Sequence, residues 1–77
     1  MSKYAPLHAF LVSQRDVLTL SFAEVADLVG GLPASAYVWA PWWENEGSTH
    51  VQARAWLSAG FHAHPNLVER TVRFERT

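Results

Sequence analysis

The chain has 77 residues, of which 49% are hydrophobic and 13% aromatic, and it carries a formal net charge of −1 without any cysteine. This length suits one domain with one core, and the lack of cysteine excludes disulfides and thiolate metal sites. No run of about eighteen apolar residues occurs, so we expect no membrane-spanning segment. The N-terminus lacks a signal-peptide pattern, and we therefore expect a cytoplasmic protein.

Hydrophobic periodicity divides the chain into helical and strand segments, without a repeat or a linker. The strongest local signal is Ser21 followed by Glu24, a capping box that marks the start of a helix; Leu20 and Val25 are placed as its hydrophobic staple. Near the C-terminus, apolar and polar residues alternate as in half-buried strands. We expect helices over residues 4–13, 22–29, 33–38 and 49–59, and strands over residues 17–20, 61–64 and 70–76.

The order of these elements predicts an α+β fold. The last two strands are expected to pair as an antiparallel hairpin, and the strand over residues 17–20 is expected to join them because an isolated hairpin is only marginally stable. A helix pair followed by a two-stranded hairpin is the plan of a winged helix-turn-helix. We therefore expect a winged helix-turn-helix-like domain with three to four helices. A generic α+β domain with helices on one face of a small sheet is the alternative.

All four tryptophans lie between Trp39 and Trp56, around a polar, turn-rich segment. We expect Trp42, Trp43 and Trp56 to belong mainly to the scaffold, with at most one of the adjacent pair exposed. Stacking of the pair on single-stranded bases is an alternative. As an aromatic surface, the segment from Trp39 to Trp43 would also suit the centre of a protein interface.

The helix expected over residues 49–59 is apolar around most of its circumference. Only a narrow polar strip and the N-terminal turn would reach DNA, with Arg54 suited to guanine and Gln52 or Asn45 to adenine. The amides of residues 48–50 would suit a phosphate. The candidate DNA-binding residues are Asn45, Ser48, Thr49, His50, Gln52, Arg54 and, on the hairpin, Arg73. A core helix with a few solvated polar residues is the alternative, and for Asn45 a turn role is favoured over base reading.

Metal binding and catalysis have weaker support in the sequence. His62 and His64 share one face of an expected strand, and His50 would join them if its helix packed beside the hairpin, so a histidine metal site is an alternative to solvated histidines. The chain has no glycine-rich phosphate loop, and the sequence establishes no nucleophile–base arrangement. We expect no catalytic residue, no metal and no cofactor.

Five segments together resemble a small uncharacterised domain family of bacteria and their phages. They are LSFAEV at residues 20–25, LPASA at 32–36, WWEN at 42–45, AWLSAG at 55–60 and VRFER at 72–76. The resemblance spans residues 4–76 and implies a prokaryotic or phage origin, but no activity. Family members often have tryptophan where this chain has Phe61, and we expect Phe61 to keep a buried aromatic role.

Two functions fit these observations. The first is a small prokaryotic or phage protein that binds double-stranded DNA as a transcriptional regulator or accessory module; a homodimer would multiply its phosphate contacts. Its support is the element order and the basic last third of the chain. The second is a protein-interaction module, such as a phage-encoded inhibitor or an antitoxin-like partner, which binds through Trp39, Trp42 and Trp43. The near-neutral charge favours this second function, because free-standing nucleic-acid binders are usually basic.

Overall fold

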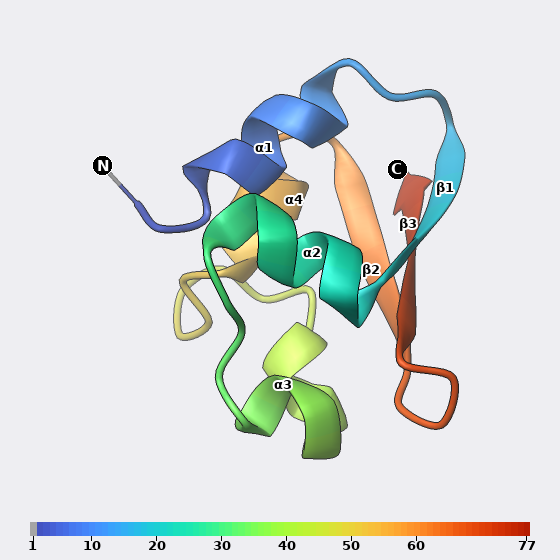
Figure 1. The fold of residues 1–77 in the computed structure, drawn as a ribbon. Helices are drawn as coiled ribbons and strands as arrows, with labels where there is room; N and C mark the ends of the chain where they lie inside the picture. The colour runs from blue at the N-terminus through green and yellow to red at the C-terminus, as the bar shows by residue number, and fades with distance from the viewer. Residues whose placement is uncertain (1) are drawn as a thin grey trace.

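Helices lie against one face of a small antiparallel sheet in the computed structural model, which describes residues 2–77 (Figure 1). The elements are α1 (Ala5–Val12), β1 (Val17–Ser21), α2 (Phe22–Val29), α3 (Ser35–Val38), the 3₁₀ helix η1 (Ala40–Trp43), α4 (Ala53–Leu57), β2 (Phe61–Asn66) and β3 (Thr71–Arg76). The α+β class is therefore confirmed. Within residues 2–77, no helix is both long enough and apolar enough to cross a bilayer.

Helix α2 begins at the capping box found in the sequence. The Ser21 amide donates to the Glu24 carboxylate at 2.8 Å, and the Glu24 amide donates to the Ser21 hydroxyl at 3.0 Å. The helix ends at Gly30, whose φ of 78° is in the left-handed region that glycine adopts without strain. These sequence patterns are enough to predict both ends of α2, because the residues that form each end are close together in the chain.

Helix α4 is shorter than the helix expected over residues 49–59. It starts at Ala53, and residues 48–52 form turns instead. The physical reason is that Ser48 and Thr49 direct both their amides and their hydroxyls to the Glu46 carboxylate. Neither residue therefore caps α4, whose first residue is Ala53.

The three strands form an antiparallel sheet in the order β1-β3-β2, so the first strand pairs with the last. Leu18 faces Phe74 and Leu20 faces Val72 across the β1–β3 pair, while Ala63 faces Phe74 across the β2–β3 pair. Strand β2 runs on to Asn66, two residues beyond the end of the strand expected over residues 61–64. The chain turns at residues 67–70, where Arg70 has a positive φ of 55°.

A column of aromatic rings forms the centre of the core. Trp43 stacks on Phe22 with ring centroids 5.0 Å apart and on Trp56 at 5.8 Å, and Trp56 packs on Phe74 of β3 at 5.8 Å. These four rings join α2, η1, α4 and the sheet, and each is at most 1% exposed. Phe61 is fully buried, in the role expected of it. The column fixes where the polar segment between η1 and α4 leaves the core.

Candidate functional site

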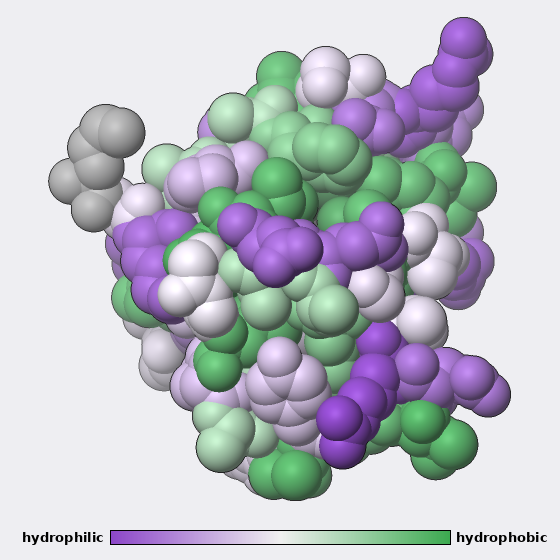
Figure 2. All heavy atoms as spheres, in the orientation of Figure 1, coloured by the Kyte–Doolittle hydropathy of each residue, from purple (hydrophilic) through white to green (hydrophobic). Residues whose placement is uncertain are grey.

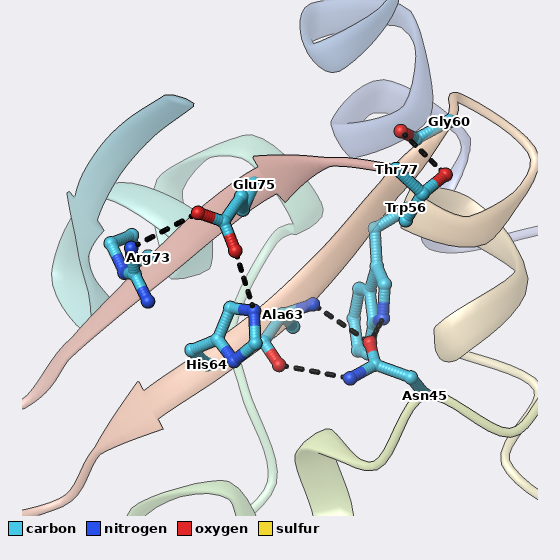
Figure 3. Close-up of polar contacts among 8 residues, drawn as sticks. All are labelled: Asn45, Trp56, Gly60, Ala63, His64, Arg73, Glu75 and Thr77. Atoms are coloured by element: carbon cyan, nitrogen blue, oxygen red, sulfur yellow. Dashed lines mark hydrogen bonds and ion pairs between the residues drawn. The ribbon is translucent and has the colours of Figure 1, made fainter. Parts of the chain in front are cut away.

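Asn45 binds the segment after η1 to the edge of the sheet (Figure 3). Its side-chain oxygen accepts from the Ala63 amide at 2.7 Å and from the Trp56 indole N–H at 2.9 Å, and its Nδ2 donates to the Ala63 carbonyl at 3.0 Å. The amide group thus occupies both outward-facing backbone groups of one residue of β2, as a neighbouring strand would. Asn45 is a structural residue here, and its polar atoms are not available to read adenine.

The Glu46 carboxylate is the centre of the turn that follows. Each of its two oxygens accepts one amide and one hydroxyl, from Ser48 at 2.9 and 2.6 Å and from Thr49 at 3.0 and 2.6 Å. An internal anion therefore already occupies two of the three amides, those of Ser48 and Thr49, that were expected to hold a DNA phosphate. A phosphate brought here would also be repelled by the carboxylate.

The hydrogen bonds to Glu46 predict a specific response to acid. The Ser48 hydroxyl, followed by the Thr49 hydroxyl and the two amides, lowers the pKa of Glu46 from 4.5 to about 2. Because the folded-state pKa is depressed, the stabilisation of this turn is fully present above pH 4.5 and is lost as the pH falls from about 4.5 toward 2. The amide chemical shifts of Ser48 and Thr49 are expected to titrate with a midpoint near pH 2.

A Glu46→Gln variant is the control for this titration. It keeps one acceptor oxygen but has no carboxyl group, so the low-pH transition in the Ser48 and Thr49 amides is expected to disappear. A wild-type midpoint near pH 4.5 would show that the carboxylate is not held in this way in solution.

Three other candidate DNA-binding residues are engaged within the domain. Gln52 is only 7% exposed, and its Nε2 donates to the Trp42 carbonyl at 2.8 Å, which weighs against the expectation that it reads adenine. The Arg54 Nε donates to the Gly47 carbonyl at 2.7 Å. The His50 ring lies 3.6 Å from the Glu44 carboxylate. These contacts stabilise the segment that sequence analysis assigned to DNA.

Arg73 lies on the solvent-exposed face of the sheet and is distant in the chain from the segment between η1 and α4. Its guanidinium is 3.3 Å from one oxygen of Glu75, and His64 is 3.5 Å from the other (Figure 3). His62 shares this face on β2. Within residues 2–77, no three histidine, aspartate or glutamate side chains come close enough to hold a metal ion.

The tryptophans divide clearly into core and surface. Trp42 is 7% exposed and Trp43 1%, which agrees with the scaffold role expected of them and weighs against the alternatives in which they contact a partner or stack on free bases. Trp39 is 51% exposed, and its ring lies 6.4 Å from that of His50. Val38, which precedes Trp39 in the chain, and Val51, which follows His50, are also exposed, at 76% and 57%.

A hollow of about 330 Å³ opens beside Val51, where α1 meets the α4 region. Its principal lining residues are Tyr4, Ala5, His8, Val51, Arg54 and Ala55. Burial raises the pKa of the Tyr4 phenol. The His8 Nδ1 lies 3.1 Å from the Ala55 carbonyl and 3.0 Å from the Ser58 hydroxyl. The sequence did not single out this hollow, because its two walls are 47 residues apart along the chain.

A family model described as Domain of unknown function (DUF7662) matches residues 4–77, nearly the whole chain. The chain belongs to this family. The match agrees with the resemblance to a small uncharacterised domain. No curated protein and no solved structure matches the chain.

Proposed function

We propose that this DUF7662 domain binds another protein through a surface that we call the Trp39–Val51 surface, formed by Val38, Trp39, His50, Val51 and the adjoining hollow. The observation that carries the proposal is the exposure of Trp39. The other three tryptophans are at most 7% exposed, whereas half of the Trp39 side chain is open to solvent. Removal of a tryptophan ring from water is energetically favourable, and a binding partner would bury the exposed half of Trp39.

The surroundings of Trp39 support an interface. Exposed tryptophan beside arginine is the composition of binding hot spots, and Arg54 lines the hollow next to Val51. The hollow is lined mainly by carbon atoms, so the partner segment that fits it presents an apolar side chain there and packs its backbone against Trp39. The face drawn in Figure 2 mixes hydrophobic and hydrophilic side chains. Such a mixture is typical of interfaces between folded proteins that bind and dissociate.

Replacing Trp39 with alanine tests this proposal. Loss of a central interface tryptophan is expected to weaken partner binding by about 30-fold or more, equivalent to roughly 2 kcal/mol. The free energy of unfolding is expected to change by less than about 1 kcal/mol, because the ring is half exposed. The partner is identified by affinity purification with the wild-type domain and mass spectrometry, and its dissociation constant is then measured by calorimetry.

Val68→Ala is the matched control, since Val68 is 91% exposed but lies in the β2–β3 turn outside this surface. It is expected to bind the partner as the wild type does. Equal affinity of the Trp39→Ala variant and the wild type for that partner would refute the proposal.

Binding of double-stranded DNA is a second candidate, favoured by one observation. The element order α1, β1, α2, α3, η1, α4 and then the β2–β3 hairpin, with β1 joined to β3, is consistent with a winged helix-turn-helix plan in which α4 is the recognition helix. The internal contacts of Asn45, Gln52 and the Glu46 turn weigh against it. They leave Arg54 as the cation of α4, and its Nε already donates to the carbonyl of Gly47, the residue after Glu46.

A mobility shift with DNA from the gene's own promoter region, repeated over a range of salt concentrations, tests the second candidate. Binding through phosphate contacts is expected to weaken steeply as salt rises, and Arg54→Ala is expected to weaken it further. Absence of a shift at low salt would exclude this function.

A further inference from the structure

The two edges of the sheet differ in whether their outward-facing backbone N–H and C=O groups are hydrogen bonded. On the outer edge of β2, the Ala63 amide and carbonyl are both bound by Asn45, at 2.7 and 3.0 Å. Pro65, two residues on, has no N–H to offer. Natural proteins protect exposed strand edges by such devices, because an open edge pairs with other strands. The β2 edge is therefore closed to a further strand.

Strand β1 forms the opposite edge, and its hydrogen-bonding pattern can be read from its two ends. The Arg76 amide donates to the Asp16 carbonyl at 2.7 Å, and the Phe22 amide donates to the Arg70 carbonyl at 2.8 Å. In an antiparallel pair, bonded positions alternate along the strand. The even-numbered residues from 16 to 22 therefore bond to β3, and the odd-numbered residues point their backbone groups away from it.

Val17 and Thr19 consequently direct two N–H and two C=O groups to the open side of β1. Within residues 2–77, none of these four groups has a hydrogen-bond partner. Figure 1 shows β1 at the border of the molecule, with no other element beyond it. Val17 is 53% exposed, and neither proline nor a bulge interrupts the strand. The β1 edge has none of the protection found at β2.

We propose that β1 pairs in antiparallel fashion with β1 of a second copy of this chain, in the register that sets Leu18 opposite Leu18. Val17 of each copy then faces Thr19 of the other. Both pairs are of the bonded kind, so each contributes two hydrogen bonds and all the free groups of Val17 and Thr19 are satisfied. A register shifted by two residues in one direction would need the Ser21 amide, which already donates to Glu24 at 2.8 Å, and in the other direction would need Arg15, which precedes the strand.

The side chains suit a second copy in this register. Val17 and Thr19 are both β-branched and lie side by side across the junction on the open face, where such pairs stabilise sheets. On the helical face, the partly buried Leu18 meets its counterpart and extends the core from one copy into the other. Directly beyond the paired segment, Arg15 lies opposite Ser21 of the second copy. The Ser21 amide already donates to the Glu24 carboxylate, so the hydrogen bonds between the two strands end there. The two three-stranded sheets become one continuous sheet, and the proposed interface shares no residue with the Trp39–Val51 surface.

Paired charge substitutions test both the dimer and its register. In V17K/T19K, lysine faces lysine at both junction positions, and the dimer dissociation constant is expected to rise about tenfold or more. In V17K/T19E, lysine faces glutamate at both positions, and dimerisation is expected to stay within about threefold of the wild type. Both sites are exposed, so each variant is expected to fold. Sedimentation equilibrium up to about 1 mM protein measures the constants.

Strand β2 offers a closely matched control. Val17 and His62 both face Glu75 across the sheet, and Thr19 and His64 both face Arg73. H62K/H64K therefore adds the same two charges on the same face, opposite the same residues of β3, but at the protected edge. Its dimerisation is expected to match that of the wild type.

Hydrogen exchange supplies a second readout at single residues. The amides of Val17 and Thr19 are expected to gain protection as the protein concentration rises, whereas those of Leu18 and Leu20 are protected at every concentration by β3. A wild type that is monomeric at about 1 mM, or a dimer that V17K/T19K leaves unchanged, would overturn the proposal.

Discussion

Replacing Trp43 with alanine is expected to remove a large part of the domain's stability at 25 °C. Trp43 is 1% exposed, stacks between Phe22 and Trp56, and donates its indole N–H to the Ala36 carbonyl at 2.9 Å. Truncation of a buried tryptophan costs about 3–5 kcal/mol. A chain of this length has a total stability of roughly 4–12 kcal/mol, so the loss removes much or all of it.

Urea denaturation followed by far-ultraviolet circular dichroism measures this effect. Trp43→Phe keeps an aromatic ring in the stack but loses the hydrogen bond to Ala36, and we expect it to cost less than half as much as alanine. Trp39→Ala removes the same side chain from the surface and is expected to remain folded. A Trp43→Ala variant as stable as Trp39→Ala would show that the aromatic column does not support the fold.

Replacing Asn45 with alanine is expected to lower the free energy of unfolding by about 2–4 kcal/mol. Three groups lose their partner at once: the Trp56 indole N–H and the amide and carbonyl of Ala63. Trp56 is fully buried and Ala63 is 3% exposed, so water replaces these hydrogen bonds poorly. The same substitution opens the edge of β2, and the Ala63 amide is expected to exchange its hydrogen much faster than in the wild type.

Asn45→Asp is the informative comparison. A carboxylate still accepts from the Trp56 and Ala63 N–H groups, but it cannot donate to the Ala63 carbonyl and places a negative charge beside it. We expect an intermediate loss of stability at neutral pH. Unchanged exchange at Ala63 in Asn45→Ala, together with a stability change below about 0.5 kcal/mol, would contradict the role assigned to Asn45.

Secondary structure that depends on residues close in sequence could be predicted well. The capping box at Ser21 and Glu24 marks the start of α2, and alternation marks β2 and β3, because each pattern involves residues that are close in sequence. The same reasoning failed at α4. There, Ser48 and Thr49 have the composition of helix caps, but the Glu46 carboxylate two and three residues earlier binds them more completely.

The candidate site was predicted only in part. Asn45, Ser48 and Thr49 were recognised as polar residues of one segment and named as candidates for DNA binding, although a turn role was favoured for Asn45. In the structure, Asn45 binds Ala63 and Trp56, and Ser48 and Thr49 bind Glu46. Of the three tryptophans proposed for an interface, only Trp39 is on the surface. Composition indicates that aromatic residues are clustered, but which ring enters the core depends on how η1 packs against α2 and α4.

Apolar spacing and capping residues act locally, so an α+β domain with a tryptophan-rich core could be predicted before any packing was known. The closure of one sheet edge by Asn45, through a residue 18 positions away, and the open edge of β1 became apparent in the folded structure. Hydrogen bonds between distant residues exist only once packing has brought their partners together. The surfaces proposed for binding, around Trp39 and along β1, follow from that packing.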